Sequence, residues 1–281
     1  MTEDPTTPKV SVIIPVYNVG RDFRRALQSV SEQTTSDLEV VVVDDGSTDA
    51  RTLRLLERAA ARPGVRVHRT ENRGPAAARN EAIKRSRGSY VAPLDADDYL
   101  APSFLAETVA VLDGEPDIGI AYTWIGLVGG HRGTWRTGGF SVPELLCRCT
   151  VHVTALYRRE VWTDVGGYDP RFVESCEDWD FWLAAAARGW RARCVPKVLA
   201  YYQRRGTSRG VRARERGVSA RLMRELVAKH RTLYERHLED AMAGLFEEYS
   251  VVSHSLERLY NHPAVSVGLR LRALLRGEGA A

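Results

Sequence analysis

The stretch Tyr90-Val-Ala-Pro-Leu-Asp95-Ala-Asp97-Asp98 carries an apolar strand directly into three carboxylates within four positions. Neighbouring carboxylates repel one another and are costly to bury, so a cluster at a strand end needs a compensating positive charge. Mg²⁺ or Mn²⁺ supplies it, because these cations prefer oxygen ligands and bind one or two carboxylates together with substrate phosphates. The alternative is that Asp97 and Asp98 form a turn or cap a helix expected from Ser103.

Upstream of this stretch, short apolar runs alternate with segments whose apolar residues recur at helical spacing. This alternation predicts an α/β fold in which helices cover a sheet of parallel strands, as in Rossmann-type domains. The predicted strands cover residues 9–15, 38–44, 65–69 and 90–94, and the predicted helices cover residues 22–33, 48–61 and 75–86.

Polar motifs follow all four predicted strands. Ligands of such sheets bind beyond the carboxyl ends of the strands, so motifs at four strand ends indicate one nucleotide site. Arg79, one turn into the third helix, either faces a pyrophosphate at the helix N-terminus or pairs with Asp95 or Asp97. The motifs are Tyr17-Asn18, Asp44-Asp45-Gly46-Ser47, Asn72-Arg73-Gly74 and Asp95-Ala96-Asp97.

Beyond residue 101 the pattern becomes mixed, and residues 1–205 are interpreted as one domain with a nucleotide-binding half (9–100) and an acceptor half (101–205). His68 and His152 fall in predicted strands and are interpreted as structural. The acceptor half is expected to contain helices at 102–112 and 177–188, strands at 118–124, 151–157 and 192–199, and a glycine-rich hairpin at 126–139.

Residues 206–281 are expected to form a helical C-terminal extension, because apolar residues recur at close to helical spacing from Val218 to Leu245 and again over 255–275. This stripe is expected to pack on the catalytic domain or on a partner, including a second copy of the chain, rather than to anchor in a membrane. Between Arg204 and Arg224, eight arginines accompany one acid. Either this run binds an anionic membrane surface or it is a solvated helix face and loop; no nucleic-acid partner is expected.

The composition of the chain is ordinary for a soluble globular protein, with 281 residues, 44% hydrophobic and 27% charged residues, and a net charge of +4. No apolar run approaches the roughly 20 residues needed to span a bilayer, and the first nine residues lack an apolar signal core. We therefore expect a cytoplasmic protein, with association at the inner membrane face as the alternative. The four cysteines show no CxxC spacing and are expected to be reduced thiols.

Together, the strand-end motifs and their spacing resemble those of family 2 glycosyltransferases with the GT-A fold. The resemblance continues through Arg158-Arg159, Gly166-Gly167-Tyr168-Asp169 and Glu177-Asp178-Trp179-Asp180-Phe181-Trp182, so it covers about residues 9–205. It implies transfer of a sugar from a nucleotide diphosphate donor, with a UDP-sugar favoured, and with inversion at the anomeric carbon.

The resemblance also implies roles for individual residues. It places Pro15, Tyr17 and Asp45 around the nucleobase, Asp95 at the ribose or the water shell of a metal, and Asp97 on a Mn²⁺ or Mg²⁺ ion that bridges the two phosphates. Further residues assigned to the nucleotide-sugar site are Asn18, Asp44, Asn72, Gly74, Arg79 and Ala96.

Asp178 matches the general base of the family, which takes the proton of the acceptor hydroxyl as that hydroxyl attacks. It starts a predicted helix, where the helix dipole favours an ionised carboxylate. The alternative is that Glu177 or Asp178 only caps this helix. Glu177 and Trp179 are assigned to the acceptor side, and Trp179 and Trp182 either line that site or pack in the core.

One departure from the family pattern concerns the metal. Many members carry a Tyr-Arg-x-His run whose histidine completes the metal shell, but here the run reads Tyr202-Gln203-Arg204-Arg205-Gly206-Thr207-Ser208. Arginine does not ligate cations but clamps phosphates, so Arg204 or Arg205 is expected to hold the donor diphosphate. The metal should then be held mainly by Asp97 and phosphate oxygens. The competing functions are a nucleotidyltransferase and a non-catalytic protein that binds nucleotide sugars.

Overall fold

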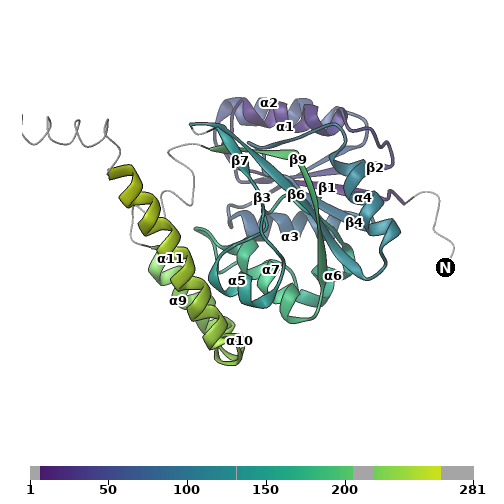
Figure 1. Ribbon diagram of the computed structural model, residues 1–281. Coiled ribbons are helices and arrows are strands. Elements are labelled where there is room, and N and C mark those ends of the chain that lie inside the picture. The colour runs from purple at the N-terminus through teal and green to yellow at the C-terminus, as the bar shows by residue number, and fades with distance from the viewer. Residues whose placement is uncertain (1–6, 131, 205–217, 261–281) are drawn as a thin grey trace, which may run out of the picture.

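The computed structural model describes residues 7–130, 132–204 and 218–260. A single mixed sheet runs through the domain, and helices cover both of its faces (Figure 1). The strands are β1 (Val10–Val16), β2 (Leu38–Asp45), β3 (Val65–Thr70), β4 (Tyr90–Pro93), β5 (Tyr99–Leu100), β6 (Ile118–Gly129), β7 (Gly133–Trp135), β8 (Leu156–Arg158) and β9 (Arg191–Arg204). The helices of this domain are α1 (Asp22–Ser31), α2 (Ala50–Ala60), α3 (Pro75–Arg85), α4 (Phe104–Gly114), α5 (Val142–Cys147), α6 (Arg159–Val165) and α7 (Glu177–Ala187).

The sheet order explains where a ligand site forms. The strands lie in the order β3-β2-β1-β4-β8-β6-β9-β5, with β7 paired to β6. The first four of these neighbours, β3 to β4, are parallel, whereas β8 is antiparallel to both of its neighbours. The carboxyl ends of β1 to β4 therefore meet at one edge, as the sequence predicted.

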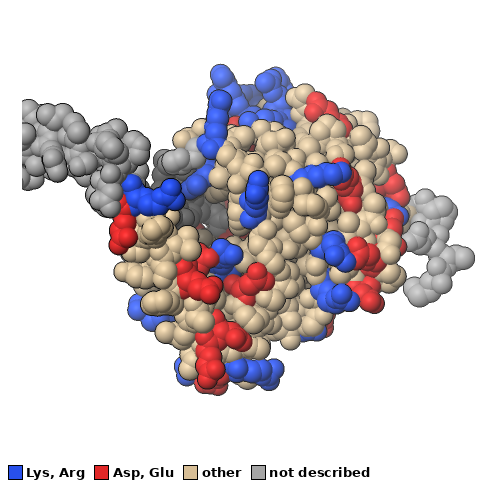
Figure 2. Space-filling model, in the orientation of Figure 1, with Lys and Arg blue, Asp and Glu red and all other residues tan. Residues whose placement is uncertain are grey.

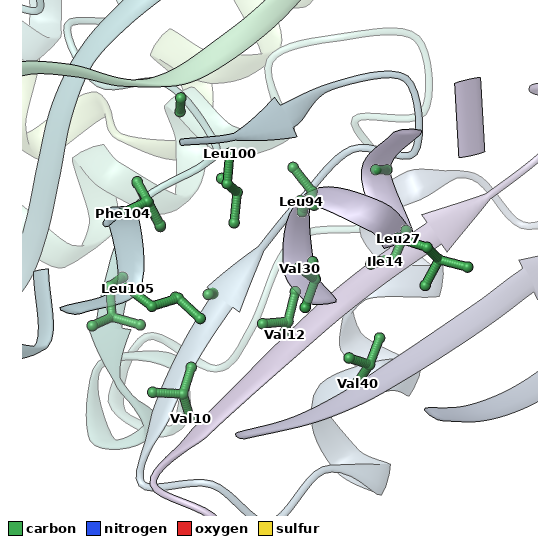
Figure 3. Packing of buried hydrophobic residues seen from close by; sticks show 14 of the residues in the cluster. Val10, Val12, Ile14, Leu27, Val30, Val40, Leu94, Leu100, Phe104 and Leu105 are labelled. Carbon is green, nitrogen blue, oxygen red and sulfur yellow. The ribbon is translucent and has the colours of Figure 1, made fainter. Parts of the chain in front are cut away.

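Alternating side chains of the parallel strands build two cores, one on each face of the sheet. Val12 and Ile14 of β1 point to the core under α1, α2 and α4, which Figure 3 shows from close by. Ile13 points to the opposite core, where α3, α6 and α7 pack. Because both faces are covered, these strands consist of nearly unbroken apolar residues.

The acceptor half differs from the sequence prediction in one strand. A strand was predicted at 151–157, but β8 covers only Leu156–Arg158 and residues 151–155 form a buried loop. The strand is short because β8 pairs with β4 and β6 over a few residues only. Before β8 the chain lies off the sheet, where His152 and Val153 line a pocket. Helices α5 and α6 were not predicted, because each has only one to two turns.

The C-terminal extension is helical over its described residues. It comprises α9 (Ser219–Lys229), α10 (Arg231–Arg236) and α11 (Leu238–Tyr260), so the helix predicted at 255–275 is described only to residue 260. Leu222 and Leu226 of α9 pack on Phe172, in the loop before α7. Lys229 Nζ lies 2.7 Å from Asp180 of α7 and 2.8 Å from Asp169, and His230 Nε2 lies 2.8 Å from Asp180.

The Asp169 contacts predict an acid-sensitive link between the extension and the domain. Arg171 and Lys229 lower the pKa of Asp169 in the folded protein, so its carboxylate stabilises the fold above its unfolded pKa of about 4. That contribution starts to fall below about pH 4 and is gone only below the folded pKa. We expect D169N to lower the melting temperature by roughly 3–6 °C at pH 7 and by less near pH 3.

The control is D117N, which removes the same kind of charge from an exposed ion pair. The side chain of Asp117 is 85% exposed, and its Oδ2 lies 3.7 Å from Arg191 Nη1. This variant should melt within about 1 °C of the natural protein, as surface changes away from special contacts usually do. An equal loss of melting temperature for D169N at both pH values would contradict the link.

Candidate active site

Two pockets adjoin at the carboxyl ends of the parallel strands, and Asp95 and Asp97 line both. The strand-end pocket has a volume of about 580 Å³. The α7 pocket has a volume of about 370 Å³ and is closed on one side by residues 175–179. Both volumes fall in the range of small-molecule sites, and the shared carboxylates mark the place where two bound molecules would meet.

The strand-end pocket gathers most of the predicted nucleotide residues. Tyr17 is half exposed at its wall. Val173 also lines it, from the loop before α7, and no sequence motif pointed to this residue because the contact joins distant parts of the chain. The predicted residues present are Pro15, Tyr17, Asn18, Asp45, Asn72, Gly74, Asp95, Ala96 and Asp97.

Asn18 and Asp45 build the walls of this pocket as well as facing it. Asn18 has a positive φ of 50°, and its Oδ1 accepts hydrogen bonds at 2.9 Å from the backbone N–H groups of Thr48 and Asp49. Asp45 accepts hydrogen bonds from the backbone N–H groups of Arg73 at 2.8 Å and Gly74 at 2.9 Å. Burial raises the pKa of Asp45, and these two hydrogen bonds oppose the rise.

The three acids of the opening cluster point in different directions. Asp95 and Asp97 face the pockets, whereas Asp98 is 1% exposed and its Oδ1 accepts the backbone N–H of Gln203 at 2.8 Å. Burial raises the pKa of Asp98, and the charges of Asp97 and Asp95 raise it further. A turn does form here, with the Asp98 N–H bonded to the Asp95 carbonyl. The predicted cap is wrong, because α4 has Ser103 at its N-cap.

Arg79 links Asp95, which lines both pockets, to Glu177 of the α7 pocket through a buried ion-pair bridge. Its guanidinium donates from Nη2 to Asp95 at 2.5 Å and from Nη1 to Glu177 at 2.8 Å, and the side chain is 1% exposed. Burial alone would lower the pKa of Arg79, but Asp95 and Glu177 outweigh that effect and raise it. The predicted pairing with Asp95 is therefore confirmed. Arg79 lines the α7 pocket, not the strand-end pocket.

The α7 pocket contains the predicted base and acceptor-side residues. Glu177, Asp178 and Trp179 all line it from the first turn of α7. Asp178 Oδ1 accepts the backbone N–H of Trp179 at 2.9 Å, but the N-cap of α7 is Cys176, so neither Glu177 nor Asp178 is the capping residue. Trp179 is fixed from its other edge, because its Nε1 donates to the carbonyl of Leu145.

Several residues of the α7 pocket were missed or assigned only a structural role. His152 comes from the buried loop, where its Nδ1 accepts the backbone N–H of Thr154 at 3.2 Å and its Nε2 lies 3.7 Å from Asp98 Oδ2. Burial lowers the pKa of His152 to about 4, which makes it a neutral imidazole at neutral pH. Among the missed residues, only Trp135 and Tyr202 have side chains whose aromatic type could have suggested a binding site from the sequence. The other missed residues are Trp135, Cys149, Val153, Ser175, Cys176, Tyr202 and Gln203.

Two predicted donor residues, Asp44 and Arg204, line neither pocket. Asp44 is buried and directs Oδ1 to the backbone N–H of Ser47, so it stabilises the turn after β2. Arg204 ends β9 and lines neither pocket. Arg205 lies outside the described residues. The arginine-rich run is described only at its ends, where Arg221 pairs with Glu174 and Glu225.

The negative charge of Asp95 and Asp97, where the two pockets adjoin, suits a divalent cation, but these two carboxylates do not form a complete set of metal ligands. Burial is the main cause of the raised pKa of Asp98, and the negative charges of Asp97 and Asp95 add to it, so a cation beside these two acids would offset part of the charge. Among the residues that the structure describes, no group of three or more His, Cys, Asp or Glu side chains converges on a possible metal position. Additional oxygen ligands would have to come from a bound molecule or from water.

A comparison with known families identifies the class of protein. The model of glycosyl transferase family 2 matches residues 11–165, which is 155 of 281 residues. The chain belongs to this family, which places it among the transferase enzymes.

Individual relatives support the same class. The chondroitin synthase of Escherichia coli is 30% identical over 188 residues, covering 65% of this chain and 27% of that protein. The uncharacterized glycosyltransferase YibD of Escherichia coli (strain K12) is 40% identical over 116 residues, covering 41% of this chain and 33% of that protein. The chain thus spans a third or less of the length of these two relatives.

Solved structures confirm the GT-A type of fold. Residues 1–349 of S. aureus TarS in complex with UDP-GlcNAc give a TM-score of 0.61 at 26% identity, covering 70% of this chain and 59% of that chain. The UDP complex gives 0.59 at 25% identity, covering 70% and 61%. Within the described residues, no helix has the length and apolar character needed to span a bilayer.

The buried bridge gives a prediction for stability. In R79M, Glu177 would remain buried without its charged partner, so we expect the free energy of unfolding to fall by about 3–5 kcal/mol. R79M/E177Q removes the unpaired charge at Glu177 and should recover part of that loss. Urea unfolding of both variants measures the difference, with R54M as the control because Arg54 is exposed. No loss in R79M, or no recovery in the double variant, would contradict the bridge.

Proposed function

We propose that this protein is an inverting glycosyltransferase that moves a sugar from a UDP-sugar to an acceptor hydroxyl. The observation that carries the proposal is the pair of pockets that share Asp95 and Asp97, with Asp178 lining the α7 pocket but not the strand-end pocket. The UDP and UDP-GlcNAc complexes of TarS support the nucleotide as donor. The nucleoside would lie in the strand-end pocket, against Tyr17 and Asp45, and the sugar would point toward the α7 pocket.

The reaction follows from this arrangement. The acceptor oxygen attacks the anomeric carbon, the bond from that carbon to the phosphate oxygen breaks, and its electron pair leaves with the diphosphate. The acceptor proton passes to the carboxylate of Asp178. Attack from the side opposite the leaving group inverts the anomeric configuration.

Asp97, with Asp95 nearby, would hold Mn²⁺ or Mg²⁺, which when bound neutralises the charge that develops on the leaving diphosphate. The ion pair with Arg79 already engages Asp95 Oδ1. Asp97 lines both pockets and is the main protein ligand in this proposal, and phosphate oxygens of the donor would complete the shell.

Asp178 is tested by its amide variant. D178N should keep donor affinity within about twofold, because Asp178 does not line the strand-end pocket, and should lower kcat by roughly 10²–10⁴-fold if it is the base. Donor binding is measured by calorimetry, and transfer by release of the nucleoside diphosphate across a panel of UDP- and other nucleotide-sugars. D164N, which changes a half-exposed acid on α6, is the matched control.

Three outcomes would contradict this role and this class. Full transfer activity in D178N would remove Asp178 as base. Diphosphate release from a nucleoside triphosphate and a sugar phosphate, without sugar transfer, would indicate a nucleotidyltransferase. Donor binding without turnover of any nucleotide sugar in the panel would indicate a non-catalytic nucleotide-sugar-binding protein.

The proposed metal site predicts that donor and metal bind together. Mn²⁺ titrated calorimetrically should bind at least tenfold more tightly with UDP present than without it, because phosphate oxygens supply ligands that the protein lacks. D97N should abolish this difference, and D117N should preserve it. Equal Mn²⁺ affinity with and without UDP would contradict a metal site completed by the donor.

A further inference from the structure

Helix α11 exposes a stripe of large apolar side chains along its length. Six residues form this stripe, and their exposed fractions range from 42% to 70%. Helix α11 lies beside α5, and Figure 1 shows its C-terminal end extending away from the sheet domain. The stripe residues are Leu238, Met242, Leu245, Tyr249, Val252 and Leu256. Large apolar residues that line up on one exposed face mark an interaction surface.

The spacing of the stripe identifies the kind of partner. Successive members are separated by four, three, four, three and four residues, which is the heptad repeat of a two-helix coiled coil. In that repeat Met242, Tyr249 and Leu256 occupy one core position, and Leu238, Leu245 and Val252 occupy the other. A period of 3.5 residues is typical of a helix that packs along another helix, rather than of one that lies on a flat surface.

The stripe is distinct from the face that α11 uses within its own chain. Ala241 is buried, and its carbonyl lies 3.5 Å from Cys147 Sγ of α5. Gly244 packs so closely on the same thiol that an added Cβ would lie 2.5 Å from it. Glu248 pairs with Arg148 at 2.5 Å. These contacts fix α11 on the domain and leave the stripe on the adjacent face.

The charges of α11 argue against a lipid surface as the occupant. The helix carries five acids, which are Glu239, Asp240, Glu247, Glu248 and Glu257, against the single arginine Arg258. In Figure 2, acidic side chains are spread over the region where α10 and α11 lie in Figure 1. Helices that lie on anionic membranes have basic polar faces instead.

We propose that the stripe is the seam through which α11 pairs with α11 of a second copy of this chain. The positions that flank the seam are Ala241, Glu248 and Ser255 on one side and Glu239, Phe246 and Ser253 on the other, so few like charges meet. The seam also extends beside Phe246, which is 71% exposed. This pairing gives a specific form to the self-association expected from the C-terminal sequence.

The length of α11 limits the affinity expected for the dimer. Its 23 residues span about 34 Å at 1.5 Å per residue. One helix pair of this length buries an area at the low end for specific interfaces, so we expect a dissociation constant on the order of micromolar.

Sedimentation equilibrium of the full chain, from about 1 to 200 µM, tests the pairing because dimerisation follows mass action. The mass should rise from the 31.4 kDa monomer toward the dimer. L245E/V252E places charges in the seam and should weaken dimerisation at least tenfold. A243E/S250E adds the same charges to exposed positions outside the stripe and should leave it unchanged. Circular dichroism and melting temperature establish that both variants fold.

A monomer at every concentration would overturn the proposal, as would a dimer that L245E/V252E leaves as strong as in the natural protein. A monomer that co-sediments with phosphatidylcholine–phosphatidylglycerol vesicles, with L245E/V252E failing to do so, would assign the stripe to a membrane and would equally overturn it.

Discussion

The guanidinium of Arg79 is the contact on which the arrangement of the site depends. It leaves α3 in the nucleotide-binding half and bonds Asp95 after β4 and Glu177 at the start of α7. Its carbon also lies 5.6 Å from the ring centre of the buried Tyr168. Because an unpaired buried charge is costly, this three-residue bridge holds the two halves of the domain in one relative position.

The bridge explains how neighbouring acids divide their roles. Asp95 is partly neutralised by Arg79, and Asp98 turns inward to the backbone of β9. Asp97 remains at the junction of the pockets, with its own carbonyl held by Arg25 at 3.2 Å. Lys229, at the end of α9, and His230 both contact Asp180, which lies on α7. The C-terminal extension thus contacts the same helix that carries Asp178.

Local patterns predicted what depends on local sequence. The alternation of apolar strands and amphipathic helices up to Leu94 gave the parallel half, and the polar residues after each strand gave the strand-end pocket. The α7 pocket was largely missed, because His152, Trp135 and Tyr202 reach it from a loop, a hairpin and a distant strand. Asp44 was wrongly assigned to the nucleotide site. Successive side chains of a strand point to opposite faces of the sheet, so Asp45 lines the strand-end pocket and its neighbour Asp44 does not.

The stereochemistry of transfer shows whether an acceptor activated in the α7 pocket attacks a donor held at Asp97. Proton NMR of the first product formed from an α-linked UDP-sugar reports the anomeric configuration through the coupling of the anomeric proton. Attack from that pocket should give a β-linked product. An α-linked first product would contradict it, because retention requires a different placement of the groups around the anomeric carbon.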